Sequence, residues 1–312
     1  MKLECKLCGF ENSADRLFCE RCFLSLRQMT RYDISNEDFI SDGDKDAFEI
    51  LEDTSLLSNI LNSVLIKPRM KRMIDSLSKN ENSLNRQSKF AGLIEECADI
   101  LSLKYLPEVK IGNLGQKNAF TTGIDERNII VIDRTLMDVL SYDEFRSLLG
   151  HEMGHIKSCH VAYHSIAEIM ERGMEFSASL LGMNLISMPM RLALKAWHRE
   201  SEISADRASL IVSNSIEPIA SLFIKIIDSK KNLMDSNTDL NLLIEFLSSH
   251  PTHLNRLKAL REFENSVQYS NIKKRLNLRK MLGPAFIEIC KFCGTQKLIE
   301  EIFCPKCNRS LV

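Results

Sequence analysis

Two short motifs carry the residues that could do chemistry. His151 and His155 belong to the sequence HEMGH, and their four-residue spacing places both imidazoles on one face of a helix. This pattern is typical of two ligands to one zinc ion, with Glu152 placed to reach a metal-bound water. Further along, Glu202 and Asp206 are also four residues apart. They offer a third ligand and a hydrogen-bond acceptor behind the ligands, so the two motifs together predict a zinc peptidase site.

The sequence around each motif has the pattern of an amphipathic helix. Ser141 and Glu144 form a capping box, and apolar side chains then recur at helical spacing as far as His151. We therefore expect one helix to begin at Ser141 and to run through the HEMGH motif. Apolar positions predict a second helix over about 191–212, which carries the second motif.

Beyond these motifs, residues from about 89 to 260 resemble the catalytic domain of the HtpX-like and type-1 CAAX prenyl protease family of gluzincin zinc metallopeptidases. The match rests on four landmarks in the family's order. They are the NAF sequence Asn118-Ala119-Phe120 with the apolar strand 129–132 after it, the HEMGH motif, the ExxxD motif, and His250-Pro251 followed by Arg256. The resemblance implies an α+β fold that is mostly helical, with a small sheet of about three strands.

The expected reaction is hydrolysis of peptide bonds in protein substrates. His151, His155 and Glu202 would hold one catalytic Zn²⁺ and leave its fourth position to water. Zinc lowers the pKa of such a water to about 7. Glu152 would act as the general base on that water and then pass the proton to the leaving amine. Asp206 would accept a hydrogen bond from the free ring nitrogen of a ligand histidine.

Two further roles follow from the resemblance alone. His250 or Arg256 would approach the metal from the far side and stabilise the oxyanion or gate the fourth position, and their spacing does not choose between them. Asn118, Ala119 and Phe120 would lie on an edge strand, to which an extended peptide substrate could add. The alternative for this strand is that it merely ends the sheet.

Each end of the chain carries four cysteines with the same spacing. Both sets have two CxxC pairs separated by ten residues, and they comprise Cys5, Cys8, Cys19 and Cys22, and Cys290, Cys293, Cys304 and Cys307. This spacing predicts two Cys₄ zinc ribbons, in which metal binding supplies the folding energy of a module too small for its own core. With one catalytic ion, three zinc ions per chain are expected. Two disulfides per module are the alternative, but they require an oxidising compartment.

The charge balance bears on what the ribbons do. The chain has 41 basic and 42 acidic residues and a formal net charge of −1, and neither ribbon has a basic face suited to nucleic acid. We therefore expect the ribbons to bind a protein partner or to pack against each other, and nucleic acid is not an expected ligand. Salt-dependent binding of DNA or RNA would reverse that expectation.

The predicted organisation has five parts. They are an N-terminal ribbon (1–28), an acidic, solvated linker (29–55), the metallopeptidase domain (56–265), a basic linker or helix (266–285) and a C-terminal ribbon (286–312). The longest uncharged run, 176–190, is shorter than the roughly 20 apolar residues that span a bilayer. With no secretory signal at the start of the sequence, this predicts a cytoplasmic protein with no transmembrane segment.

The reading that these features favour is a zinc metalloendopeptidase. An alternative from a different class is an adaptor, in which the ribbons and a peptidase-like domain bind peptides without cutting them. Glu152 separates the two, because a binding module has no need of a general base.

Overall fold

A computed structural model of the protein describes residues 2–5, 8–13, 16, 19–21, 26, 29–30, 34–53, 71, 75, 90–114, 118–124, 127–161, 163, 188–227, 251–282, 284–285, 287–293, 295–298, 302–304 and 306–310. Its elements in chain order are β1 (Lys2–Glu4), β2 (Glu11–Ser13), β3 (Met29–Thr30), η1 (Asn36–Asp38), α1 (Asp42–Asp53), α4 (Ala91–Ile100), β4 (Glu108–Gly112), β5 (Ala119–Ile124), β6 (Arg127–Asp133), α5 (Arg134–Met137), α6 (Tyr142–Lys157), α9 (Met188–Ser213), α10 (Glu217–Ile227), α12 (Pro251–Glu264), α13 (Val267–Leu282), β7 (Pro284–Ala285), β8 (Ile287–Ile289) and β9 (Gln296–Leu298).

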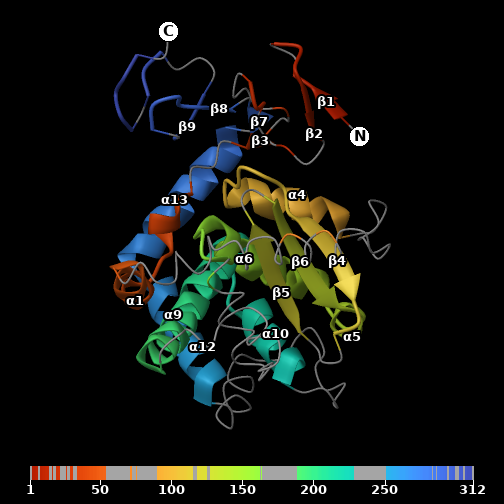
Figure 1. Ribbon diagram of the computed structural model, residues 1–312, viewed down its shortest axis with the longest axis vertical. Helices are drawn as coiled ribbons and strands as arrows, with labels where there is room; N and C mark the ends of the chain where they lie inside the picture. The colour runs from red at the N-terminus through yellow and green to blue at the C-terminus, as the bar shows by residue number, and fades with distance from the viewer. Residues whose placement is uncertain are drawn as a thin grey trace.

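Helix α6 lies in the middle of the main domain, with a three-stranded sheet on one side and α9 on the other (Figure 1). Buried apolar side chains from all three layers form one continuous core, to which Leu149 on α6, Ile130 on β6 and Leu210 on α9 belong. Both predicted helices are confirmed, since α6 begins after Ser141 and α9 covers the expected 191–212. The two motifs therefore lie on adjacent helices.

The sheet has the strand order β4-β6-β5, with β4 parallel and β5 antiparallel to β6. β6 holds the apolar run 129–132, and all four of its side chains are buried, as expected for a central strand covered on both faces. Among the described strands, β5 is at the edge of the sheet and contacts α6. It pairs with β6, and Ala119 lies opposite Ile132. The α+β class with a small sheet is confirmed.

The acidic segment that we expected to be a solvated linker is instead folded onto the main domain. Helix α1 packs against α9, and Asp44 and Leu51 on it are buried. The prediction was wrong for 34–53 because it counted charges without their spacing. Asp46 and Glu49 are exposed, whereas positions 44, 47, 48 and 51 recur at helical spacing and turn toward the domain.

The buried end of α1 is fixed by polar contacts. The indole Nε1 of Trp197 donates to Asp44 Oδ1 at 2.9 Å, and the backbone N–H of Ser41 donates to Ser204 Oγ on α9 at 3.0 Å. The Phe48 ring lies 5.8 Å from the Trp197 ring, centroid to centroid. These contacts hold the segment on the side of α9 opposite the second motif.

The two cysteine modules lie together at one end of the molecule (Figure 1). Each contains a two-stranded antiparallel hairpin, β1–β2 in the first and β8–β9 in the second. The segment that follows the first module pairs with the segment that precedes the second, through Met29 with Ala285 and Thr30 with Pro284. The first module also touches the main domain, where Arg16 Nη1 donates to Tyr105 Oη at 2.7 Å. A short backbone ladder thus joins the segments that flank the two modules, and packing of the modules against each other stays a prediction.

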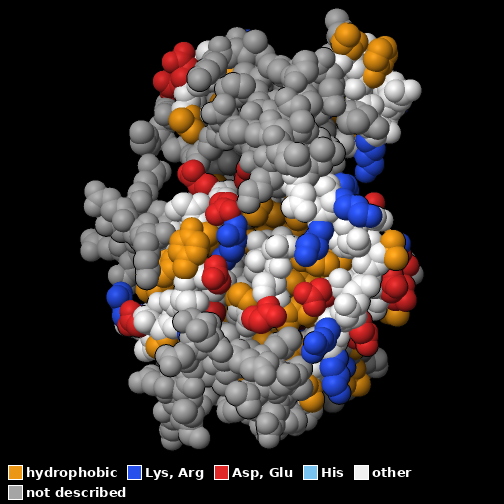
Figure 2. All heavy atoms as spheres, turned by 180° about the vertical axis from the view of Figure 1, so that it is seen from behind, with side chains coloured by type: hydrophobic (Ala, Val, Ile, Leu, Met, Phe, Trp, Pro, Cys, Tyr) orange, Lys and Arg blue, Asp and Glu red, His pale blue; other side chains and the backbone are white. Residues whose placement is uncertain are grey.

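The C-terminal module exposes apolar side chains. Phe292, Ile302 and Phe303 are exposed, and hydrophobic side chains stand out at the outer end of the molecule (Figure 2). Across the residues that the structure describes, no helix combines the length and the apolar character needed to cross a bilayer. Most of the uncharged run 176–190 lies outside the described residues.

Candidate metal centre

The start of α6 is fixed by side chains. Ser141 is the N-cap, and its backbone N–H donates to Glu144 Oε2 at 2.6 Å while Glu144 N–H donates to Ser141 Oγ at 3.3 Å. Glu144 also accepts from Lys225 Nζ at 2.7 Å and from Ser221 Oγ at 2.5 Å, both on α10. The predicted capping box is confirmed, and it anchors the helix whose next turns carry His151.

Two glycines let α6 approach α9 closely. A Cβ added to Gly150 would lie 2.9 Å from Ser209 Cα, and one added to Gly154 would lie 2.8 Å from Ala208 Cβ. Carbon atoms in ordinary contact are about 3.5–4.0 Å apart, so any larger residue at either position would push the helices apart. Glycine at these positions brings the side chains of the two motifs within reach of one another.

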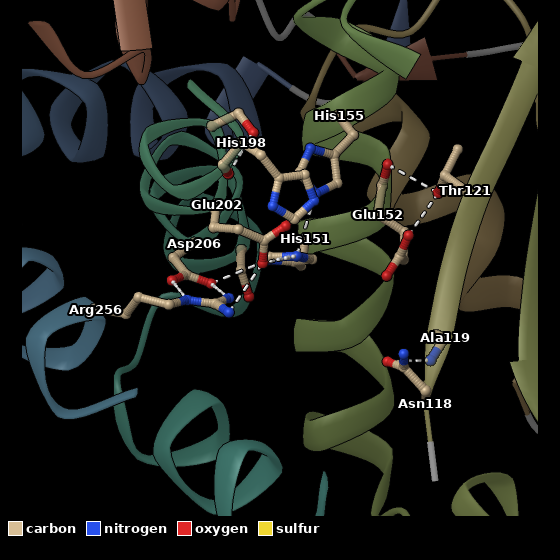
Figure 3. A network of polar contacts seen from close by, with 12 residues as sticks. Asn118, Ala119, Thr121, His151, Glu152, His155, His198, Glu202, Asp206 and Arg256 are labelled. Atoms are coloured by element: carbon tan, nitrogen blue, oxygen red, sulfur yellow. Dashed lines mark hydrogen bonds and ion pairs between the residues drawn. The ribbon is translucent and has the colours of Figure 1, made fainter. Parts of the chain in front are cut away.

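The side chains of His151, His155 and Glu202 converge between the two helices (Figure 3). The two Nε2 atoms are 3.3 Å apart, and each lies 3.5 Å from a carboxylate oxygen of Glu202. Zinc bonds of about 2.0–2.1 Å in a tetrahedron place ligand atoms about 3.3–3.4 Å apart. The three donors therefore fit one zinc ion in both chemistry and spacing.

Asp206 lies behind His151, one of the two candidate histidine ligands. Its Oδ1 is 2.9 Å from Nδ1 of His151, so the Nδ1–H tautomer donates to the carboxylate and leaves the Nε2 lone pair for a metal. Burial disfavours a charged imidazole, but the hydrogen bond to Asp206 and the carboxylate of Glu202 outweigh it and raise the pKa of His151. Burial likewise opposes ionisation of Asp206, but Arg256 and His151 outweigh it and lower the pKa of this carboxyl.

Arg256, on α12, joins the two carboxylates of the second motif. Its Nε and Nη2 donate to the two oxygens of Asp206, each at 2.7 Å, and its Nη1 lies 2.9 Å from Glu202 Oε2. Burial would lower the pKa of Arg256, but these carboxylates raise it well above its ordinary value. The guanidinium is thus engaged with Asp206 and with the candidate ligand Glu202. His250, the other residue expected at this place, lies outside the described residues.

Glu152 points away from the three converging donors, toward the sheet (Figure 3). Its Oε2 accepts a hydrogen bond of 2.6 Å from the hydroxyl of Thr121 on β5, and both residues are buried. The sequence had pointed to the NAF residues and missed Thr121. Strand alternation could have indicated it, because residues 119 and 121 of a strand share a face.

The three NAF residues lie at the start of the edge strand. Asn118 Oδ1 accepts from the backbone N–H of Ala119 at 2.9 Å, and Asn118 O accepts from Asp133 N–H at 2.9 Å. Ala119 is buried in the main core, and Phe120 is half-buried in a smaller apolar cluster on the other face. Asn118 therefore fixes the beginning of β5.

The cysteines of the C-terminal module form a second type of donor cluster. The sulfurs of Cys290, Cys293, Cys304 and Cys307 gather at one point. The Cys290–Cys307 and Cys293–Cys304 Sγ distances are 3.8 and 3.5 Å. Disulfide sulfurs are about 2.05 Å apart, whereas zinc–sulfur bonds of about 2.3 Å in a tetrahedron separate the sulfurs by about 3.8 Å. The spacing therefore fits four ligands of one zinc ion better than two disulfides.

The N-terminal module repeats this arrangement in the residues that can be seen. Cys5, Cys8 and Cys19 gather at one point, and the Sγ atoms of Cys8 and Cys19 are 3.6 Å apart. The buried side chain of Asn12 also donates to Cys19 Sγ at 3.6 Å, as suits a thiolate acceptor. Cys22, the expected fourth ligand, lies outside the described residues.

Comparison with known proteins points to one family. The model of the family described as Peptidase family M48 matches residues 84–264. Plastoglobule-localized metallopeptidase 48 of Arabidopsis thaliana is 26% identical over 248 residues, which cover 72% of this chain and 67% of the relative. A protease HtpX homolog of Moorella thermoacetica is 25% identical, over 62% of this chain and 78% of the relative. Another HtpX homolog, from Salinibacter ruber, is 30% identical over 37% of this chain and 48% of its own length.

Proposed function

The chain belongs to peptidase family M48, and we propose that it is a zinc-dependent metalloendopeptidase that hydrolyses peptide bonds in protein substrates. The observation that carries the proposal is the spacing of the donors His151, His155 and Glu202, at 3.3–3.5 Å from one another. A zinc ion held there supplies an acidified water and polarises the substrate carbonyl.

Glu152 is the proposed general base. Its carboxylate does not belong to the cluster of candidate ligands, which suits a group that acts on the water and not on the metal. It takes a proton from the attacking water and delivers that proton to the amine nitrogen as the peptide C–N bond breaks.

Asp206 and Arg256 have a positioning role in this proposal. Asp206 fixes the ring and tautomer of His151, and Arg256 holds both Asp206 and Glu202. The engagement of the guanidinium by two carboxylates favours this role over direct stabilisation of an oxyanion. It also offsets part of the negative charge of the second motif.

Extended polypeptide is the proposed form of the substrate. In the described part of the chain, β5 is the edge strand of the sheet and packs on α6. A strand edge recognises an extended chain through its backbone more than through its side chains. Flexible or unfolded segments of proteins fit this recognition. The names of the relatives, a metallopeptidase and HtpX proteases, support a protein or peptide substrate.

The cysteine modules are proposed to be zinc ribbons that hold one structural ion each, which gives three zinc ions per chain. Sulfur spacings of 3.5–3.8 Å support this assignment. The exposed apolar side chains of the C-terminal ribbon favour a role in recruiting a protein partner. Whether the chain works in the cytoplasm stays a prediction.

Cleavage of a fluorophore-labelled unfolded protein by the zinc-loaded chain tests the proposal, with the Glu152→Gln variant beside it. We expect cleavage by the parent and a rate at least about a hundredfold lower for the variant, since general bases contribute about 10²–10⁴-fold. Equal rates would refute Glu152 as the base. Absence of cleavage by a chain with its zinc bound would favour the adaptor, a peptide-binding module without catalysis.

Metal content tests the assignment of the ions independently of turnover. We expect three zinc ions in the parent, and two in each of His155→Ala and Cys304→Ser. Only His155→Ala should lose peptidase activity with its ion. If His155→Ala kept three ions, the catalytic site would be wrongly placed.

A further inference from the structure

The hydroxyl of Thr121 reaches across from the sheet to the side chain of Glu152. The Oγ1–Oε2 distance is 2.6 Å, and the same Oγ1 lies 3.4 Å from the backbone carbonyl oxygen of Glu152 (Figure 3). We propose that Thr121 is a positioning residue for the general base, which joins the edge strand to Glu152. This inference deepens the proposed function and rests on it.

The direction of the hydrogen bond is settled by chemistry. An ionised carboxylate can only accept, so the hydroxyl of Thr121 donates its single proton to Glu152. Of its two acceptors, the carboxylate oxygen is 0.8 Å closer (3.4 against 2.6 Å), and hydrogen bonds to charged acceptors are the shorter and stronger class. The proton of Thr121 is therefore directed at Oε2.

Burial gives this contact its importance. Thr121 is 2% exposed and Glu152 is 5% exposed, so neither side chain can exchange its partner freely for bulk water. A carboxylate has several rotamers around its terminal bonds. A short hydrogen bond from the strand selects the rotamer that turns Oε2 toward the sheet.

The hydrogen bond is compatible with both states of the base. When Glu152 removes a proton from water, the O–H bond breaks, its electron pair stays on the attacking oxygen, and the proton binds Oε1. Oε2 remains an acceptor, so Thr121 keeps its own proton and its hydrogen bond throughout. The proton on Oε1 then moves to the leaving nitrogen, which regenerates the carboxylate.

Thr121 also lies on the strand proposed to receive the substrate. Because β5 is at the edge of the sheet, a peptide added to it would be fixed by the same rigid element that fixes Glu152. The same strand would thus position both the general base and the scissile bond. Such positioning lowers the activation barrier of the chemical step without tighter binding of the substrate. Loss of the hydroxyl should therefore lower kcat and leave KM nearly unchanged.

Thr121→Val tests the inference, because it removes the hydroxyl and keeps the shape. Thr121→Ser is the rescue variant, because it restores the hydroxyl at the same position. All variants are compared as the zinc-loaded full chain.

We expect Thr121→Val to lower kcat about ten- to a hundredfold with KM within about twofold, as for loss of one hydrogen bond to a charged group. Thr121→Ser should stay within about threefold of the parent. Zinc content should remain three per chain in every variant. If Thr121→Val does not fold, Thr121→Ala removes the hydroxyl without adding a methyl group.

A second readout does not depend on turnover. With ¹³C-labelled glutamate, the side-chain carboxyl resonance of Glu152, identified by its absence in Glu152→Gln, should move in Thr121→Val and not in Thr121→Ser. An unmoved resonance, or a kcat equal to that of the parent, would overturn the inference while leaving the proposed function intact. An inactive parent would instead overturn the proposed function, and with it the role given to Thr121.

Discussion

Replacement of Gly154 by alanine tests whether the close approach of α6 and α9 creates the metal centre. The new Cβ would lie 2.8 Å from Ala208 Cβ and 3.2 Å from Ala205 Cα. Ordinary contact begins at 3.4 Å, so the helices must separate locally by roughly 0.6 Å, the difference between 3.4 and 2.8 Å. Ala205 lies between Glu202 and Asp206 on α9, and Ala208 lies two residues after Asp206. A local separation of the helices there would therefore move Glu202 away from the two histidines.

Two opposing effects set the change in stability. Alanine is a better helix former than glycine by about 1 kcal/mol, whereas overpacking costs about 1–3 kcal/mol. We expect the overpacking to win, and the free energy of unfolding to fall by up to about 2 kcal/mol. Zinc should respond more strongly, because metal–ligand distances tolerate only about 0.2 Å. An affinity loss of about 10–100-fold is the scale seen when ligands are misplaced.

Gly92 on α4 provides the matched control. A Cβ added there meets no atom within 4 Å, so Gly92→Ala should keep the parent's zinc affinity and gain up to about 1 kcal/mol of stability. Urea unfolding, followed by the fluorescence of the single tryptophan, measures stability. Zinc content after dialysis against chelators of increasing strength measures affinity. If Gly154→Ala held its catalytic zinc as tightly as Gly92→Ala, the close approach would not be what assembles the ligands.

Three other predictions follow from contacts around the site. Arg256→Met leaves the buried Asp206 and the half-buried Glu202 without their cation, so urea unfolding of the metal-free chain should show a loss of about 3–5 kcal/mol. A loss below about 1 kcal/mol would contradict the role given to this residue. Asp44→Ala removes the acceptor of the Trp197 indole. The free energy of unfolding should fall by about 1–3 kcal/mol, and the tryptophan emission should shift. An unchanged emission spectrum would argue against the packing of α1 on α9. Burial raises the pKa of Glu144, but hydrogen bonds led by that from Lys225 outweigh it and lower the pKa below its ordinary value of 4.5. The stability that this carboxylate contributes is thus full above pH 4.5 and lost as pH falls through the lower, folded-state pKa; unfolding measured from pH 6 to 3 should show this loss in the parent and less of it in Glu144→Gln.

Local sequence patterns predicted the parts of the site that local structure determines. The capping box at Ser141 fixed where α6 begins, and the four-residue spacing of His151 and His155 placed both rings on one face. The family resemblance, now confirmed, supplied the order of the landmarks. The capping box and the histidine spacing each depend on residues within a few turns of one another, which is the range over which helix periodicity carries information.

Contacts between distant segments were not predictable in the same way. Thr121 meets Glu152 across 31 positions of sequence, and nothing in the residues near either one encodes their distance. The direction taken by Arg256 depends on how α12 packs on α9, which spacing within α12 does not determine. The acidic helix α1 is a different case, because its apolar stripe was present in the sequence and was hidden by the number of charges around it.

The short ladder between β3 and β7 has a consequence for the order in which the chain assembles. Its two strands lie at nearly opposite ends of the sequence, so on the ribosome β3 is made early and must wait until the peptidase fold has emerged. Contacts between such distant segments form late, because closing a long loop is entropically costly. Before β7 is available, the proposed first zinc ribbon can fold on its metal alone. Pairing of β3 with β7 then joins the two segments that flank the peptidase domain in sequence.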